Sequence, residues 1–287
     1  MSAAEPPQSA NPAPPGGSEA AKPQAWGDHT SAAEPPQSAN PAPPGGSEAA
    51  TPQAWGGHTS AADAAPPLAI LGGTFDPVHY GHLHLAEDVR KALALRDVHL
   101  VPAADPPHRG APHASARDRV AMLGLAVRDF PGLVVDTREI ARGGKSYTVD
   151  TLAALRAERP RTPLLLLLGA DQFRSLATWH RWPALFDLAH LVVVPRPGVA
   201  VDADLPEALA QQWQRRHTRD AQALRSRSAG SIYLQPVTPH SISSTAIRSA
   251  FARGDGESVE IAGLLPPAVL AYIESNGLYP PPPTHAS

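Results

Sequence analysis

The sequence predicts an α/β domain, doubly wound around a mostly parallel sheet, over residues 67–279. Two observations lead to this fold class. Short apolar runs alternate with segments whose apolar residues recur at helical spacing, and each run is nearly continuous. Continuous runs are typical of strands buried on both faces, and strand-helix repeats are typical of parallel βαβ units. In such sheets, ligands bind beyond the carboxyl ends of the strands, where the strand order reverses.

The first 66 residues differ in composition from the rest of the 287-residue chain. Fourteen of the 34 prolines fall within the first 67 residues, and Ser2–Thr30 recurs almost unchanged as Ser31–Thr59. The repeat has almost no Val, Ile, Leu or Phe, so little apolar burial offsets the cost of ordering its backbone. We therefore expect residues 1–66 to be a disordered tandem-repeat extension and residues 280–287 to be a disordered tail.

Strands and helices are expected to alternate within residues 67–279. The predicted strands are residues 68–71, 98–101, 133–136, 164–168, 191–194 and 232–237. The predicted helices are residues 83–95, 116–130 and 148–160, the first of which is expected to begin near Gly81, and a later helix that begins near Ser243. This succession supports the doubly wound arrangement.

The stretch LGGTFDPVHYGHLH after the first predicted strand carries more polar chemistry than a connection requires. Gly72 and Gly73 lack Cβ atoms, so their N–H groups can approach a ligand closely and their backbone can take dihedral angles that other residues avoid. His79 and His82 are three residues apart, which places both on one face if the helix reaches back that far. Imidazoles beside free N–H groups at the positive end of a helix indicate a phosphate-binding site.

Three simpler interpretations of this stretch stay open on the residues alone. Two glycines after a strand are often only a tight turn. The two histidines could be half of a metal site, although the chain has no Cys and no further ligand set is evident. They could also be core histidines that are satisfied by hydrogen bonds. A nicotinamide-cofactor fingerprint is absent, because GGTFDP is not G-x-G-x-x-G.

A second polar cluster opens the helix within PHSISSTAIRSAFARG. Ser243, Ser244 and Thr245 stand at its start, and Arg248 lies four residues beyond Ser244 on the same face. Hydroxyl and N–H groups at a helix start, together with a guanidinium, form a second anion-binding cradle. Taken alone, the cluster could equally be an ordinary capped helix.

Together, these stretches resemble a known family. GGTFDPVHYGH with ISSTAIR resembles the nucleotidyltransferases that carry an H-x-G-H signature, here HYGH. The intervening segments VPAADPPHR, SYTVDTL, LLGADQFRSLATWHRW and VVVPRPG look like those of bacterial nicotinate-nucleotide adenylyltransferase, and they follow in the right order from about Leu68 to Tyr279. The resemblance implies a Rossmann-like nucleotidyltransferase fold and a catalytic domain over residues 67–279.

The resemblance also implies an activity: adenylyl transfer from ATP to nicotinate mononucleotide with Mg²⁺ as cofactor, giving deamido-NAD and pyrophosphate. The implied catalytic residues are His79, His82 and Arg248. The implied ATP-binding residues are Gly72, Gly73, Thr74, Phe75, Ser243, Ser244 and Thr245. The implied nicotinate-mononucleotide residues are Arg109, Thr148, Asp171, Trp179 and His180, and no residue is implied as a direct metal ligand. Arg109 departs from the Lys of many members, and the Pro-rich extension has no counterpart in the family pattern.

Composition limits the remaining function classes. Without Cys the chain has no disulfide or thiolate metal site, which fits a reducing cytoplasm, where we expect the protein to act. The N-terminus has no basic and apolar leader pattern, and no window resembles a membrane span. The formal net charge of −3 argues against broad nucleic-acid binding. Whether the chain forms a homo-oligomer is left open.

Three rival functions remain at this stage. A sister enzyme would adenylate nicotinamide mononucleotide or phosphopantetheine, but SYTVDTL and TWHRW favour the nicotinate substrate. A non-catalytic nucleotide-binding regulator would be expected to lose one of the motif residues, yet all are present. An adaptor would recruit partners through polyproline segments, but no P-x-x-P with flanking basic residues is convincing. TWHRW could also be only a core-anchoring aromatic pair; we expect one Trp to pack and the other to stack on the pyridine.

Overall fold

The computed structural model describes residues 65–107, 110–195, 198, 200–240, 242–255 and 259–281. The extension that we predict to be disordered lies outside the described residues, apart from Ala65 and Pro66. The predicted tail lies outside them after Pro281. Within the described residues, no helix has both the length and the apolar character needed to span a membrane.

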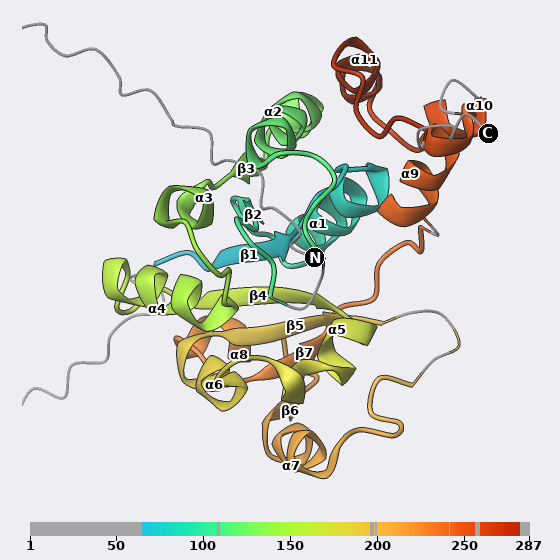
Figure 1. Ribbon diagram of the computed structural model, residues 1–287. Coiled ribbons are helices and arrows are strands. Elements are labelled where there is room, and N and C mark those ends of the chain that lie inside the picture. The colour runs from blue at the N-terminus through green and yellow to red at the C-terminus, as the bar shows by residue number, and fades with distance from the viewer. Residues whose placement is uncertain are drawn as a thin grey trace, which may run out of the picture. The chain divides into compact units, whose positions relative to one another are not determined.

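The domain is built around a seven-stranded sheet with the order β3-β2-β1-β4-β5-β7-β6 (Figure 1). Its strands are β1 (Leu68–Gly73), β2 (Val98–Pro102), β3 (Leu133–Val135), β4 (Leu164–Gly169), β5 (His190–Val194), β6 (His217–Thr218) and β7 (Ile232–Leu234). Every pairing between them is parallel. The doubly wound fold class is therefore confirmed.

The strand order reverses at β1. The chain runs outward from β1 through β2 to β3, and then returns to place β4 on the other side of β1. Helices that leave β1 and β4 on opposite faces of a parallel sheet open a crevice between them at the carboxyl ends of these two strands. Gly73 and Gly169, the last residues of β1 and β4, therefore mark where this fold places a ligand.

Helices cover both faces of the sheet (Figure 1). They are α1 (Tyr80–Ala92), α2 (Ala116–Ala126), α3 (Arg138–Arg142), α4 (Thr148–Glu158), α5 (Ala170–Arg174), α6 (Leu185–Leu188), α7 (Glu207–Arg216), α8 (Ala223–Ser226), α9 (Ser244–Arg253), α10 (Val259–Ala262) and α11 (Pro267–Ser275). Alternate residues of β1 enter two separate cores. Leu71 packs with residues of α1, α2, α9 and α11, whereas Ile70 packs with residues of α4, α5, α6 and α7.

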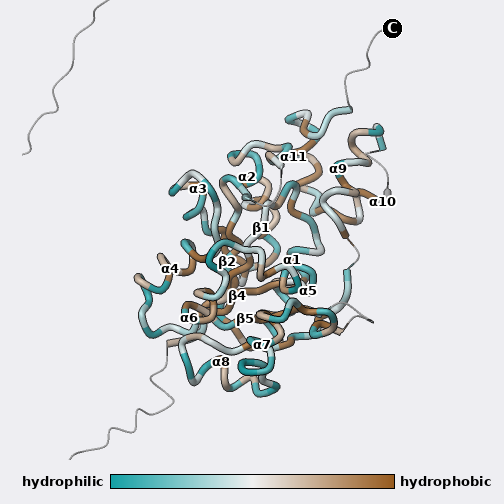
Figure 2. Tube along the Cα trace, turned by 60° about the horizontal axis from the view of Figure 1, so that its bottom comes forward, coloured by the Kyte–Doolittle hydropathy of each residue, from teal (hydrophilic) through white to brown (hydrophobic). Residues whose placement is uncertain are grey.

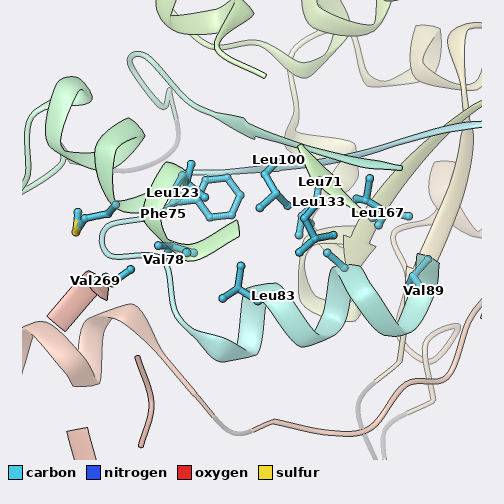
Figure 3. Packing of buried hydrophobic residues seen from close by; sticks show 14 of the residues in the cluster. Leu71, Phe75, Val78, Leu83, Val89, Leu100, Leu123, Leu133, Leu167 and Val269 are labelled. Atoms are coloured by element: carbon cyan, nitrogen blue, oxygen red, sulfur yellow. The ribbon is translucent and has the colours of Figure 1, made fainter. Parts of the chain in front are cut away.

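The apolar residues follow these two cores. Figure 2 shows the hydrophobic stretches concentrated along the strands β1, β2, β4 and β5, with hydrophilic residues on the outer turns of the helices. In the first core, Leu83 and Val89 of α1 point toward the strands, and Phe75 lies beside Leu123 and Val78 (Figure 3). A strand that is buried on both faces explains why its sequence is apolar without alternation.

The last strands differ from expectation. The strand predicted at residues 232–237 ends at Leu234, although the N–H of Gln235 still donates to the carbonyl of Val193 at 3.0 Å. The two-residue strand β6 and the helices α7 and α11 were not among the predicted elements. The other predicted strands and the four predicted helices are present, with ends that differ by up to a few residues.

Candidate active site

Two adjoining cavities lie at the carboxyl ends of β1 and β4. The larger, of about 420 Å³, reaches Thr148, Trp179 and His180, and the smaller, of about 280 Å³, reaches His82, Ser244 and Arg248. The residues that line both cavities are Gly72, Gly73, Thr74 and Gln172. The structure therefore places the predicted pyridine side and the predicted phosphate side next to each other, with the glycine loop as their shared wall.

The glycine loop is shaped by what packs against it. A Cβ on Gly73 would lie 3.0 Å from Cζ of Phe75, whereas a Cβ on Gly72 would meet nothing within 4 Å. Phe75 itself has φ of 51° and is 2 % exposed, and its ring meets the His82 ring edge-on at 5.0 Å. Neither glycine has a positive φ, so the expectation that they supply unusual dihedral angles is wrong. Gly73 is needed for space, and Gly72 leaves the cavity wall open.

The two histidines of HYGH have different surroundings. His79 precedes α1 in an extended conformation, with φ of −148°, so it caps the helix rather than belonging to its first turn. Its ring nevertheless stacks on that of His82, with centroids 3.8 Å apart. A Cβ on Gly81 would lie 3.0 Å from Nδ1 of His79, which explains the glycine between them.

Burial separates the two rings chemically. His79 is 4 % exposed and does not line either cavity, and burial lowers its pKa from 6.5 to about 4. It is therefore neutral at physiological pH and carries no charge toward an anion. His82 lines the smaller cavity. The structure brings His82 alone of the pair to the cavity wall and places His79 beneath it.

Helix α9 begins where the sequence predicts. The Ser243 hydroxyl accepts from the N–H of Ala246, which makes Ser243 the N-cap. The Ser244 hydroxyl donates to the carbonyl of Pro77 at 2.9 Å, and Nη1 of Arg248 donates to the carbonyl of Asp76 at 2.6 Å. These two bonds join α9 to the turn that follows the glycine loop. Thr245 accepts from Nη2 of Arg248 at 3.4 Å.

The larger cavity is lined by aromatic rings and by the start of α4. The start of α4 reaches the cavity through Tyr147, Thr148 and Val149, and the N–H groups at the start of a helix favour a negative charge. The Tyr147 ring lies 4.3 Å from that of His180. Trp179 lines the cavity, while Trp182 packs edge-on against Phe186 at 6.1 Å and does not line it.

The outcome differs for two of the predicted substrate residues. Asp171 is exposed on α5 and lines neither cavity. Arg109 lies outside the described residues. The roles that the resemblance implies for both stay predictions.

Sequence reasoning missed three residues that the structure places at the cavities. Gln172 lines both, and its Oε1 accepts from the N–H of Gly169 at 3.0 Å; the spacing of three residues from a helix start is the signal that could have found it. Glu139 lines the larger cavity and accepts a hydrogen bond from the Thr151 hydroxyl, and no local sequence pattern predicts this pairing. Asp76 lines the smaller cavity as the centre of a buried hydrogen-bond network.

No protein metal site is evident in the described parts of the chain. No group of three or more His, Asp or Glu side chains there is arranged to hold a metal ion. The side chains at the smaller cavity instead include donors suited to anions, namely an imidazole and a guanidinium. This chemistry fits a metal ion that arrives with bound phosphates, because Mg²⁺ keeps several waters and is commonly held through substrate phosphates.

Comparisons with known proteins identify the family. Residues 70–250 match the family described as cytidylyltransferase-like. A "probable nicotinate-nucleotide adenylyltransferase" of Aeromonas salmonicida is 47 % identical over 213 residues, which cover 74 % of this chain and 97 % of that protein. One of the same description from Acidithiobacillus ferrooxidans is 48 % identical over 215 residues, with 75 % and 96 % covered.

The fold has solved counterparts. A structure of Plasmodium falciparum nicotinic acid mononucleotide adenylyltransferase complexed with NaAD superposes with a TM-score of 0.57 at 16 % identity. The match covers 75 % of this chain and 98 % of that one. At this level of identity the likeness concerns the fold.

Proposed function

The chain belongs to the nicotinate-nucleotide adenylyltransferases among the cytidylyltransferase-like proteins, and from that premise we propose that it transfers the adenylyl group of ATP to nicotinate mononucleotide. The products are nicotinate adenine dinucleotide, or deamido-NAD, and pyrophosphate. The observation that carries the proposal is the pair of cavities that share the wall formed by Gly72, Gly73 and Thr74. Two substrates bound side by side would meet at that wall.

The reaction needs alignment more than it needs a base. A phosphate oxygen of the mononucleotide attacks the α-phosphorus of ATP, a new P–O bond forms, and pyrophosphate leaves with the electrons of the broken bond. A phosphate monoester has a second pKa near about 6, so the nucleophile is largely deprotonated at neutral pH. Holding two reactants in line can supply roughly 7–11 kcal/mol of the barrier reduction.

Charge on the phosphates is met by the side chains of His82 and Arg248 at the smaller cavity, whereas the Ser244 hydroxyl already donates to the carbonyl of Pro77. The Arg248 guanidinium carries five N–H groups, of which two donate to Asp76 and Thr245, so three remain for phosphate oxygens. One donor aimed at developing charge is worth about 2.7–4 kcal/mol. We assign the direct contact to His82 and give His79 the role of holding the His82 ring in place by stacking.

Mg²⁺ is the ion that we propose accompanies ATP. Bound to the phosphates, it would neutralise charge that develops on the leaving pyrophosphate. The protein's contribution is the donor set at the smaller cavity, which binds and orients the same phosphates.

Selection of nicotinate over nicotinamide is proposed to occur in the larger cavity. The pyridine carboxylate needs several donors, which an amide NH₂ group cannot satisfy. The N–H of Trp179 is already bonded to the carbonyl of Leu176 at 2.9 Å, so the donors fall to the Thr148 hydroxyl, the start of α4 and the N–H of His180. The Trp179 indole then supplies an apolar surface for the pyridine.

The test is pyrophosphate release by the full chain with ATP, Mg²⁺ and either nicotinate mononucleotide or nicotinamide mononucleotide. We expect release with the nicotinate form and a strong preference for it. His82→Ala should lower turnover by about 10²-fold or more while the thermal unfolding midpoint stays close to that of the unmodified chain. Equal use of both mononucleotides would refute the selectivity assigned to the larger cavity, and no release with either would refute the reaction.

A further inference from the structure

Asp76 is a buried carboxylate that receives hydrogen bonds from distant parts of the chain. It is 4 % exposed. Its Oδ2 accepts from the N–H of His113 at 2.8 Å, and its Oδ1 accepts from the N–H of Ala114 at 3.0 Å and from the Tyr279 hydroxyl at 2.8 Å. Its main-chain carbonyl accepts from Arg248. One residue thereby joins the glycine loop, the loop at 110–114, helix α9 and the C-terminal segment.

Three of these four segments form the walls of the smaller cavity. The glycine loop and residues 110–113 line it directly, and α9 contributes Ser244 and Arg248. The residue before Asp76 is Phe75, whose φ of 51° is a conformation that bulky side chains rarely adopt. Such a conformation persists where the surroundings over-determine it. The bonds to Asp76 restrain the chain on one side of Phe75, and the bond from buried Arg119 to the carbonyl of Thr74, at 2.8 Å, restrains it on the other.

Tyr279 belongs to the network but does not line the smaller cavity. Its hydroxyl reaches Asp76 across 203 positions of sequence, and its ring lies 6.2 Å from that of Phe251 on α9. Tyr279 thus contacts both α9 and the residue on which Arg248 of α9 docks. It does not line either cavity, and no substrate contact is needed for it to affect the geometry of the phosphate donors.

We propose that Tyr279 is a positioning residue for the ATP phosphates, which acts by holding Asp76 and, through it, the glycine loop and Arg248. The proposal rests on the proposed adenylyl transfer, because it assigns the smaller cavity to ATP. Burial makes Tyr279 a permanent donor, since it raises the pKa of the hydroxyl far above the physiological range. Burial raises the pKa of Asp76, but the bonds from His113, Tyr279 and Ala114 outweigh it and hold that pKa below its ordinary value, so the carboxylate stays an acceptor.

The chain offers a matched control for removing this hydroxyl. Tyr272 of α11 also donates to a carboxylate, that of Asp118 on α2, at 2.9 Å, but it touches neither cavity. Tyr279→Phe and Tyr272→Phe therefore each remove one hydroxyl-carboxylate bond from the C-terminal region. We expect Tyr279→Phe to lower kcat/KM for ATP about tenfold, and Tyr272→Phe to stay within about twofold of the unmodified chain.

A double-mutant cycle separates positioning from general loosening. If Tyr279 acts through Asp76, then Asp76→Asn with Tyr279→Phe should have a kcat/KM for ATP no lower than Asp76→Asn alone. The KM for nicotinate mononucleotide should change less than the KM for ATP in Tyr279→Phe, because the larger cavity shares the glycine loop with the network but not Arg248 or the loop at 110–113. Additive losses in the cycle, or a kcat/KM for ATP in Tyr279→Phe equal to that in Tyr272→Phe, would overturn the proposal.

Two further measurements keep the outcomes distinct. Circular dichroism at the assay temperature shows whether Tyr279→Phe is folded; if it is not, Asp76→Asn alone must lower kcat/KM for ATP selectively, and no selective loss would overturn the proposal. ATP affinity is measured by calorimetry with Mg²⁺ in every variant. If the unmodified chain transfers no adenylyl group, the proposed function is refuted. The positioning role of Tyr279 is then tested by ATP affinity alone: Tyr279→Phe should bind ATP more weakly than Tyr272→Phe, and equal affinities would overturn the proposal.

Discussion

Gly73→Ala should damage both stability and activity, whereas Gly72→Ala should affect activity alone. A Cβ on Gly73 would meet the Phe75 ring at 3.0 Å, while ordinary carbon contacts lie at about 3.5–4.0 Å, so the ring must move by about 0.5 Å. Phe75 is 2 % exposed and packed among Leu71, Val78 and other core residues, so it has little room to give (Figure 3). Overpacking of this kind costs about 1–3 kcal/mol.

That cost corresponds to a fall of roughly 2–12 °C in the thermal unfolding midpoint of a domain of this size. The displaced Phe75 ring touches His82, so kcat should also fall about tenfold. At Gly72 the added methyl group meets open space in the cavity wall, so the unfolding midpoint should not fall while KM for ATP rises. The assays are calorimetric unfolding and pyrophosphate release on both variants. Equal losses of stability in the two would refute the packing argument.

Three other predictions concern stability and pH. Gly124 lies at an exposed position of α2, where a Cβ would meet nothing within 4 Å. Gly124→Ala should raise the free energy of unfolding in urea by about 0.5–1 kcal/mol without changing kcat, and a loss of stability would contradict this prediction. Burial disfavours the charged form of His79 and lowers its pKa in the folded chain to about 4, so below about pH 6.5 the unfolded chain binds a proton that the folded chain does not. The free energy of unfolding should therefore fall as the pH drops from 6.5 to 4. In urea titrations at each pH, His79→Gln should reduce this dependence of stability on pH. For Asp136, burial raises the pKa, but the hydrogen bonds from His99 and Arg138 outweigh burial and lower the pKa to about 2. The ionised carboxylate therefore contributes about 2 kcal/mol to the free energy of unfolding above pH 4, and this contribution is lost toward pH 2. The free energies of unfolding of Asp136→Asn and the unmodified chain should differ at pH 7 and converge at pH 2.

The fold class was predictable because burial on both faces of a sheet leaves its mark on each strand separately. The runs at β1, β2, β4 and β5 are apolar whatever their neighbours are, so reading them needs no knowledge of pairing. β6 has only two residues, which is too short for any periodicity to be read. Its place in the sheet depends on the adjoining edge of β7.

The site was predictable to the extent that its chemistry lies in short stretches. The N-cap at Ser243 and the proximity of His79 and His82 each follow from residue spacing at a helix start, that of α9 for the cap and that of α1 for the histidines. Spacing could not tell which imidazole faces the cavity, because that depends on what buries each ring. His79 is covered by the fold around it, and His82 is not.

By itself, the sequence determined the alternation of strands and helices, the residue types that can bind phosphate and the family to which they belong. Only the tertiary structure decided that the glycine loop is shared between two cavities, that Gln172 reaches both, and that Tyr279 meets Asp76. The physical reason is the separation along the sequence over which each kind of interaction acts. Apolar periodicity and helix capping act within a few residues, whereas a buried carboxylate takes its donors from whichever segments the packed core brings to it, here as far as 203 positions away.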